Sequence, residues 1–298
     1  MSILVNEKTK VLIQGITGHE GSRAAKEMLA YGTQVVAGVT PGKGGQRVEG
    51  VPVYNTVAQA VDKHPEINTS LIVVPAFAVL DAALEAMLNG IQLVNILTEL
   101  VPPRECAEIY AWSRRTGSRV IGPASVGIIS PGKGKIGSIG SGGVSSIFKP
   151  GPIGVVSKSG GMTSEIAVIL SRAGLGQSTA LGIGGEQIIG SDFVDIMELF
   201  EADKQTKAIV MFGEVGGSYE ERVAEYVLAG KLTKPIVAVI GGKFTNKLPQ
   251  GTVLGHAGAI VGKGKGSYES KTKAMKRAGI RLANTLEEIP EIIKRITN

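Results

Sequence analysis

Several residue types and patterns are scarce in this chain, and each shortage excludes a class of protein. A single cysteine, Cys106, leaves no pair for an internal disulfide and no cysteine set for a structural zinc site. Aromatic residues make up only 4% of the chain, which argues against a nucleic-acid surface that stacks bases on rings. No apolar run is long enough to cross a bilayer, and the N-terminus lacks a secretory pattern. We therefore expect a cytoplasmic protein with no nucleic-acid or membrane partner.

The length and composition predict two α/β domains. At 298 residues, the chain can form two domains that each have a core. Because 43% of the residues are hydrophobic and few are aromatic, these cores must consist mainly of Val, Ile, Ala and Leu. The 42 glycines indicate many tight turns, which fits an α/β protein and excludes a coiled coil. The net charge of +6 is spread along the chain and suits a protein that handles phosphates and carboxylates.

The N-terminal pattern is a strand, a glycine-rich turn and a helix. Residues 10–14 (KVLIQ) predict a buried strand, residues 15–21 (GITGHEG) predict a turn, and residues 22–32 predict a helix. The glycine spacing in the turn is looser than that of the dinucleotide-binding fingerprint. The helix N-terminus with its free N–H groups is nevertheless a natural site for a phosphate group.

The second predicted strand, residues 34–39, argues against NAD as the ligand. NAD sites place an acidic residue at the end of this strand to bind the ribose hydroxyls. Here the strand ends before Thr40, and Lys43 follows in the turn PGKGG at residues 41–45. This lysine offers positive charge to a phosphate, although a solvated loop lysine would give the same pattern. We therefore expect a phosphate-rich ligand without nicotinamide.

Strands alternate with helices along the rest of the chain. Further strands are predicted at residues 71–75, 93–97, 119–123, 153–157, 179–183, 208–212 and 235–242. Residues 127–150 carry many turn signals and no helical period, so we interpret them as an irregular connector. The predicted domains are then residues 1–126 and residues 151–298. Because open parallel sheets bind ligands at the carboxyl ends of their strands, Thr98 and Glu99 are candidate site residues.

In the second half, glycine-rich loops follow the strands and converge on one edge of the predicted sheet. His256 lies between small residues in one such loop, GHAGAI at residues 255–260, where a large group could reach its ring. Glu214 directly follows a strand and could accept a proton from one imidazole nitrogen, which would leave the other free to attack a phosphoryl group. A helix that begins after Gly161 points its N-terminus at the same edge. The alternative is that His256 and Glu214 only hold tight turns.

The chain lacks the features needed to bind a nucleoside triphosphate alone. No GxxxxGK[ST] segment is present, and no ATP-grasp arrangement of basic and acidic residues is evident. The sequence therefore predicts a phosphoryl acceptor that depends on a partner protein for the nucleotide.

Eight segments together resemble a known family. They are GITGHEG (15–21), GVTPGKGG (38–45), LTEL (97–100), IGP (121–123), KSGG (158–161), GIGG (182–185), GEVGG (213–217) and GHAGAI (255–260). From end to end the chain resembles the α subunit of succinyl-CoA synthetase and the matching region of ATP-citrate lyase and citryl-CoA synthetase. The resemblance implies a Rossmann-like CoA-binding domain followed by a flavodoxin-like parallel-sheet domain. It also implies an ATP-grasp β subunit that holds ATP or GTP and Mg²⁺.

The resemblance also assigns residues to roles. His256 would be the phosphohistidine, and Glu214 the carboxylate that orients it. The implied CoA contacts are Thr17, Gly18, His19, Glu20, Lys43, Leu97, Thr98 and Glu99. Residues expected near the phosphate and the acid substrate are Ser159, Gly160, Gly161 and Ser164, and no metal ligand is expected within the chain. The implied reaction joins a small carboxylic acid to CoA at the expense of ATP or GTP.

Two departures bear on which acid is used. Succinyl-CoA synthetases usually carry tyrosine within SGTLTYE, whereas this chain has SGGMTSE at 159–165 with Ser164 in that place. The segment IGPASVG at 121–127 also looks like the citrate-using relatives. We therefore expect citrate as the acid, with the product stopping at citryl-CoA, and keep succinate as the alternative. A non-catalytic CoA-binding module is the remaining alternative, and the choices between ATP and GTP and between αβ and α₂β₂ stay open.

Overall fold

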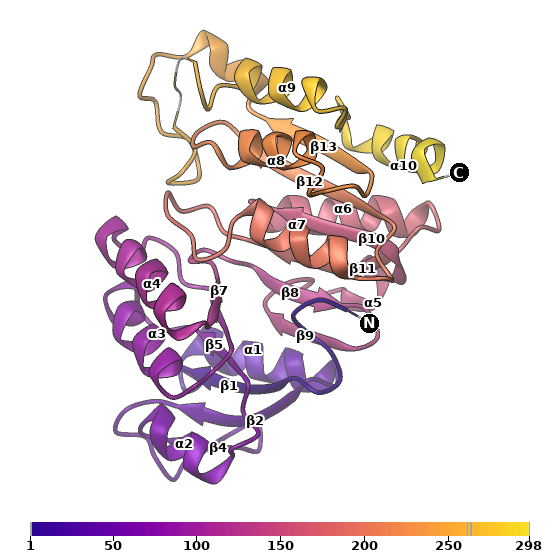
Figure 1. Cartoon of the computed structure of the whole chain (residues 1–298). Coiled ribbons are helices and arrows are strands. Elements are labelled where there is room, and N and C mark those ends of the chain that lie inside the picture. The colour runs from indigo at the N-terminus through magenta and orange to yellow at the C-terminus, as the bar shows by residue number, and fades with distance from the viewer. Residues whose placement is uncertain (1, 261, 263, 298) are drawn as a thin grey trace.

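The computed structural model describes residues 2–260, 262 and 264–297, which form two largely parallel sheets flanked by helices (Figure 1). Within the described part of the chain, no helix is long and apolar enough to cross a bilayer.

The first sheet has the strand order β3-β4-β2-β1-β5-β6-β7 and is parallel except for the β3–β4 pair. Its strands are β1 (Lys10–Gln14), β2 (Gln34–Val39), β3 (Arg47–Val48), β4 (Val51–Tyr54), β5 (Thr69–Ile72), β6 (Leu93–Ile96) and β7 (Arg119–Ile121). Without β3 this is the doubly wound order of nucleotide-binding folds, in which ligands bind where the strand order reverses, here between β1 and β5. The Rossmann-like prediction for this half is confirmed.

Helices cover both faces of the first sheet. They are α1 (His19–Ala30), α2 (Val57–Lys63), α3 (Val79–Leu88), preceded by the 3-10 turn η1 (Ala76–Ala78), and α4 (Pro103–Thr116). The two ends of α4 follow from its sequence. Pro103 begins the helix, where a missing N–H loses no hydrogen bond, and Gly117 ends it in a left-handed conformation at φ 77°. Helices α2, α3 and α4 share one apolar cluster, whereas α1 packs on the other face against β9 (Gly134–Gly137).

The second sheet has the order β14-β13-β12-β10-β11-β8-β9. Its strands are β8 (Gly127–Ser130), β9 (Gly134–Gly137), β10 (Pro150–Ser157), β11 (Gln177–Gly182), β12 (Ala208–Glu214), β13 (Ile236–Gly241) and β14 (Arg281–Leu282). Strands β10 to β14 are parallel in the flavodoxin-like order 2-1-3-4-5, as expected. The helical elements are α5 (Val144–Ile147), α6 (Gly160–Arg172), α7 (Phe193–Ala202), α8 (Tyr219–Leu228), η2 (Lys243–Lys247), α9 (Tyr268–Arg277), η3 (Leu286–Glu288) and α10 (Ile289–Thr297).

The prediction that residues 127–150 form an irregular connector is wrong. Strands β8 and β9 form an antiparallel hairpin in this segment, and β8 extends the second sheet by pairing with β11. Both strands contain glycines, which are typical of turns in a sequence and therefore hide the strand pattern. The close pairing requires glycine at 127, since a Cβ there would lie 2.0 Å from the Ile136 carbonyl oxygen. The expected domain limits, 1–126 and 151–298, stay predictions.

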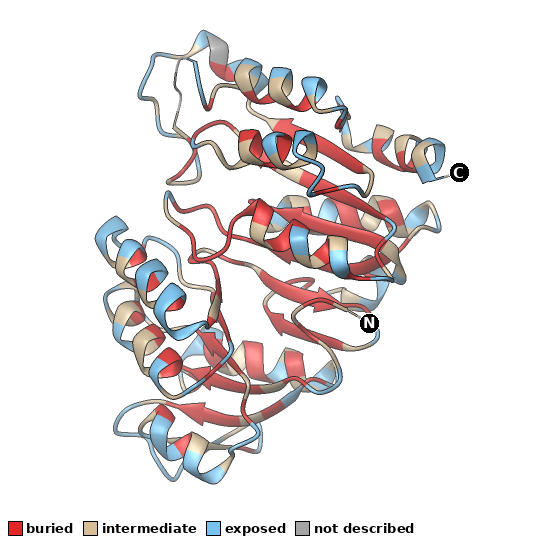
Figure 2. Cartoon of the chain, viewed as in Figure 1, coloured by how far each residue is buried: buried red, intermediate tan, exposed pale blue. Residues whose placement is uncertain are grey.

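Buried residues make up most of the strands of both sheets and continue in the segment between them (Figure 2). One apolar cluster includes Ile13 of the first sheet, Ile136 of the hairpin and Leu181 of the second sheet, all fully buried. As the composition predicts, aliphatic residues make up most of this core, with Phe193 and Phe200 as large fully buried exceptions. The two halves therefore share a continuous core, which holds the loops at their facing edges in fixed positions.

Candidate functional site

His256 and Glu214 form a hydrogen-bonded pair at the carboxyl edge of the second sheet. Glu214 is the last residue of β12, and His256 lies in the loop between η2 and α9. The imidazole Nδ1 is 2.8 Å from Glu214 Oε2 and 3.0 Å from Oε1. The carboxylate side chain is only 12% exposed, whereas that of the histidine is 35% exposed. One side of the ring is therefore fixed by the carboxylate, and the imidazole stays accessible.

The hydrogen bond that the His256 ring donates to Glu214 is the main cause of a raised pKa for His256. Partial burial opposes this rise, and the positive charge of Lys158 also lowers the pKa of His256, whereas Glu99 adds to the rise. When the ring is neutral, the hydrogen bond favours the tautomer that carries its proton on Nδ1. Nε2 is then a free nucleophile.

Backbone contacts between loops set the position of the imidazole. The N–H of Gly258 donates to the carbonyl of Gly185 at 2.9 Å, and the N–H of Ala259 donates to the carbonyl of His256 at 3.0 Å. A Cβ on Gly185 would lie 2.7 Å from the Cγ and Cδ2 atoms of the ring. The absence of a side chain at 185 therefore allows the ring to pack directly against the loop that follows β11.

A cavity of about 450 Å³ opens beside His256 and is formed by loops from both halves of the chain. Its lining residues include the predicted site residues Leu97, Glu99, Ser159, Gly160, Gly161 and His256. Ser164 is half-buried in the first turns of α6 and does not line this cavity. The structure thus brings candidate residues from three distant segments to one place.

The N-terminus of α6 faces this cavity and can bind an anion. Ser159 caps the helix by accepting a hydrogen bond from the N–H of Met162 at 3.4 Å. Gly160 and Gly161 form the first turn, where N–H groups have no partner within the helix. Because no side chain covers them, these N–H groups and the helix dipole favour a phosphoryl group.

A second cavity, of about 660 Å³, lies at the carboxyl ends of β1 and β5, where the first sheet reverses its strand order. Thr17 and Gly18 line it together with apolar side chains such as Val39, Val74 and Phe77. Gly15 must be glycine at its φ of 87°, since a Cβ would lie 2.4 Å from the Val73 carbonyl oxygen. This turn therefore brings the chain close to the ligand position expected for a nucleotide.

The other predicted CoA contacts do not line this second cavity. His19 and Glu20 begin α1, are exposed and contact each other at 3.1 Å. Lys43 is exposed in the loop after β2. The hydroxyl of Thr98 donates to the carbonyl of Val74 at 2.7 Å, so Thr98 ties the loop after β6 to the loop after β5.

Two charged residues of the cavity beside His256 were missed by sequence analysis. Lys158 directly precedes Ser159, and Glu186 directly follows the GIGG segment. Glu186 Oε1 accepts a hydrogen bond from the N–H of Leu100 at 2.7 Å, which joins the two halves across the cavity. Lys158 directly follows β10 and begins the KSGG segment, and Glu186 lies in the loop after β11, so their positions after strand ends were the signal that could have identified them.

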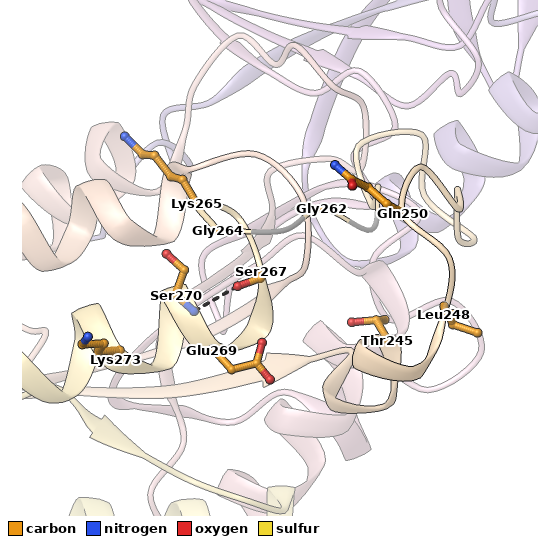
Figure 3. Close-up of a pocket in the computed structure, with 10 residues that line it drawn as sticks. All are labelled: Thr245, Leu248, Gln250, Gly262, Gly264, Lys265, Ser267, Glu269, Ser270 and Lys273. Atoms are coloured by element: carbon orange, nitrogen blue, oxygen red, sulfur yellow. Dashed lines mark hydrogen bonds between the residues drawn. The ribbon is translucent and has the colours of Figure 1, made fainter.

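A third cavity, of about 690 Å³, lies at the N-terminal end of α9 (Figure 3). There the N–H of Ser270 donates to the hydroxyl of Ser267, the capping residue, at 3.1 Å. None of the residues that line this cavity is a predicted site residue. Across residues 2–260, 262 and 264–297, no group of three or more His, Cys, Asp or Glu side chains could hold a metal ion.

Comparisons with known proteins agree with the two halves of the fold. Residues 6–100 match the CoA binding domain, and residues 156–281 match the CoA-ligase domain. A succinate–CoA ligase [ADP-forming] α subunit from Archaeoglobus fulgidus is 47% identical over 99% of this chain and 100% of its own length. The chain belongs to this family of CoA-ligase α subunits.

The names of other relatives contain different acid substrates. A subunit of an ADP-forming sulfoacetate–CoA ligase from Acholeplasma is 39% identical over 99% of this chain and 98% of its own length. The structure of ATP citrate lyase from Methanothrix soehngenii with citrate and coenzyme A matches with a TM-score of 0.92 at 27% identity, covering 99% of this chain. This chain spans 50% of that lyase chain.

Proposed function

We propose that this chain is the CoA-binding, phosphohistidine-carrying α subunit of an ADP-forming acid–CoA ligase. The observation that carries the proposal is the pair of Glu214 and His256 beside a cavity that both halves of the chain line. A histidine that only held a turn would not need a buried carboxylate on one nitrogen and an open anion site beside the ring.

The first step is phosphorylation of His256. The lone pair on Nε2 forms a bond to the γ-phosphorus of the nucleotide as the bond to the bridging oxygen breaks, and ADP or GDP leaves. Glu214 holds the proton on Nδ1 and stabilises the positive charge that develops on the ring. The N–H groups of Gly160 and Gly161 neutralise part of the phosphoryl charge.

The second step passes the phosphoryl group to the acid. A carboxylate oxygen of the acid attacks phosphorus, the P–N bond breaks, and Nε2 regains its lone pair. CoA supplies the thiolate that then takes the acyl group and releases inorganic phosphate. Storing the phosphoryl group on His256 thus divides one unfavourable condensation into three transfers: of the phosphoryl group to His256, of the phosphoryl group to the acid, and of the acyl group to CoA.

The cavity at the end of β1 and β5 suits the nucleotide part of CoA. The helix N-terminus after Gly18 provides free N–H groups for phosphate, and apolar side chains around Val74 and Phe77 provide a surface for a base. Thr17, Gly18, His19, Glu20 and Lys43 would hold this part, while Leu97, Thr98 and Glu99 lead towards His256.

We propose an ATP-grasp β subunit as the partner that holds the nucleotide and Mg²⁺. The support is that the chain has no phosphate-binding GxxxxGK[ST] loop, and its CoA-ligase relatives are named as subunits. For the acid we propose succinate, because the relative at 47% identity is named for it. Citrate, the expectation from the sequence, stays the second candidate, supported by Ser164 and by the likeness to ATP citrate lyase.

The test of the histidine is labelling in the reconstituted complex. With the β subunit and γ-labelled ATP or GTP, wild-type chain should acquire an acid-labile, base-stable label, and His256→Ala should acquire none. A label that persists in His256→Ala, or CoA binding without any label, would replace this proposal with a different acceptor or with a non-catalytic CoA-binding module.

A further inference from the structure

Three buried charged side chains lie directly behind the pair of Glu214 and His256. Lys271 and Glu220 have fully buried side chains, and the side chain of Lys158 is 3% exposed. Lys271 Nζ forms an ion pair with Glu220 Oε2 and also donates to the carbonyl of Gly216 at 2.6 Å. Lys158 Nζ lies 3.5 Å from Glu220 Oε1.

Glu220 is already engaged by partners other than Lys158. Its Oε1 accepts a hydrogen bond from the N–H of Glu214 at 3.1 Å, and its Oε2 is held by Lys271. Glu220 thereby fixes the end of β12 from which the Glu214 carboxylate reaches His256. Lys271 in turn ties α9 to the loop that follows β12.

Lys158 is the member of this group whose ammonium N–H groups have no close acceptor among the described residues. An ammonium group has three N–H donors. Within the described residues, its contacts are the ion pair with Glu220 at 3.5 Å and the ring of Tyr219, whose centroid is 5.4 Å away. A buried cation with such long contacts can take a closer anion without losing a strong hydrogen bond.

Lys158 also borders the position at which a phosphoryl group on His256 would lie. It lines the same cavity as His256, and its charge acts on the imidazole. In the chain it lies directly before Ser159, the capping residue of α6. Its side chain and the free N–H groups of the helix therefore border one space.

We propose that Lys158 is a catalytic residue whose ammonium group donates a hydrogen bond to the phosphoryl group on Nε2 of His256, and that Glu220 and Lys271 are positioning residues for Glu214. This inference rests on the proposed phosphohistidine. In the unphosphorylated chain, Lys158 pairs weakly with Glu220. When the phosphoryl dianion arrives, Lys158 supplies a cation whose own side chain is only 3% exposed, and a contact with such a buried cation is strong.

The test uses the full chain with phosphoramidate as a small phosphoryl donor, so that neither partner nor nucleotide is needed. His256 Nε2 takes the phosphoryl group as the P–N bond of the donor breaks and ammonia leaves, and phosphorus NMR follows the product. We expect Lys158→Met to react at least about tenfold more slowly than wild type. Lys158→Arg should restore most of the rate, since it keeps the charge.

The matched control is Lys135→Met. Lys135 is also fully buried and pairs with one carboxylate, Glu27, at 2.9 Å. Glu27 keeps Arg23 as a partner when Lys135 is removed, just as Glu220 keeps Lys271 when Lys158 is removed. Lys135→Met should react at the wild-type rate, so an equal loss in both methionine variants would overturn the proposal.

A second readout distinguishes a charge effect from a structural one. Because the charge of Lys158 lowers the pKa of His256, Lys158→Met should raise that pKa in an NMR titration of the imidazole, whereas Lys135→Met should not. An unchanged rate or an unchanged titration in folded Lys158→Met would overturn the inference. Failure of His256 to be labelled by nucleotide in the complex would instead overturn the proposed function, so the two failures can be told apart.

Discussion

Glu214 Oε2 lies 2.8 Å from His256 Nδ1, although the two residues are separated by 42 positions in the chain. The contact joins the end of β12 to the loop between η2 and α9. A fixed carboxylate thus determines which imidazole nitrogen faces the cavity. Two consequences, one for stability and one for reactivity, can be measured.

Replacing Glu214 by Gln should change how stability depends on pH. In the folded chain the pKa of His256 is raised above the 6.5 of an unperturbed histidine, chiefly by Glu214. A raised folded-state pKa means that the pair stabilises the fold fully below the unfolded-state value and loses this effect as pH rises through the folded-state value. The wild-type advantage in free energy of unfolding should therefore be larger at pH 5.5 than at pH 9, as measured by urea unfolding. An equal difference at both values would contradict this.

The same Glu214→Gln variant should slow phosphorylation of His256 by about 100-fold or more, because the ring loses the charge that favours its reactive tautomer. Glu225→Gln, a change of an exposed glutamate on α8, is the matched control and should leave the rate unchanged. A similar rate for both variants would mean that Glu214 does not orient the ring.

Adding a methyl group at Gly185 should displace the imidazole. Because the new Cβ would lie 2.7 Å from ring carbons of His256, we expect the ring to shift from the position in which it contacts Glu214. We expect Gly185→Ala to reduce phosphorylation by about tenfold to 100-fold, the usual result of a small misplacement of a reacting group. Gly262→Ala, whose Cβ would meet no atom within 4 Å, should react normally. Normal labelling of Gly185→Ala would show that the ring has room to adjust.

Periodicity and turn signals in the sequence were sufficient to predict most of the fold. The strands β12 and β13 have continuous apolar runs and the long helix α4 has an amphipathic pattern, so the alternation of strands and helices followed. Strand β5 (Thr69–Ile72) begins two residues before the strand predicted at 71–75, because Thr69 and Ser70 are polar and break the apolar pattern. The hairpin β8–β9 was missed because its glycines remove the alternation that marks a strand, and because its pairing with β11 is set by distant residues. The two-residue strand β3 is too short to leave a pattern.

Site residues were predicted where neighbouring residues in the sequence indicate them. They were missed where only packing in the folded chain shows their role. His256, Glu214 and Ser159 stand out through their neighbours in the sequence. Lys158 looked like any loop lysine, and nothing local shows that its side chain is buried beside Glu220. Lys271 lies on α9 together with two exposed lysines, Lys273 and Lys276, so its full burial is set by tertiary contacts.

Removing the charge of Lys43 should weaken CoA binding without affecting His256. Lys43 is exposed in the loop after β2, so a contact with a CoA phosphate would be partly screened by solvent. We expect Lys43→Ala to lower CoA affinity by about fivefold at low salt, and less at high salt, in calorimetric titrations. Lys63→Ala, at an exposed lysine on α2, should bind CoA as wild type does. An equal loss of CoA binding and of phosphorylation in Lys43→Ala would instead assign Lys43 to the fold.

Ser164 should influence which acid receives the phosphoryl group. It lies on α6 one turn beyond the glycines of the cavity beside His256, where succinyl-CoA synthetases are expected to carry tyrosine. In the complex with its β subunit, Ser164→Tyr should raise the ratio of kcat/KM for succinate to that for citrate by about tenfold, since a larger side chain leaves less room for a tricarboxylate. Labelling of His256 by nucleotide precedes entry of the acid and should not change. If the ratio of thioester formation from the two acids is the same in both proteins, Ser164 does not select the acid, and the argument for citrate loses its residue-level support.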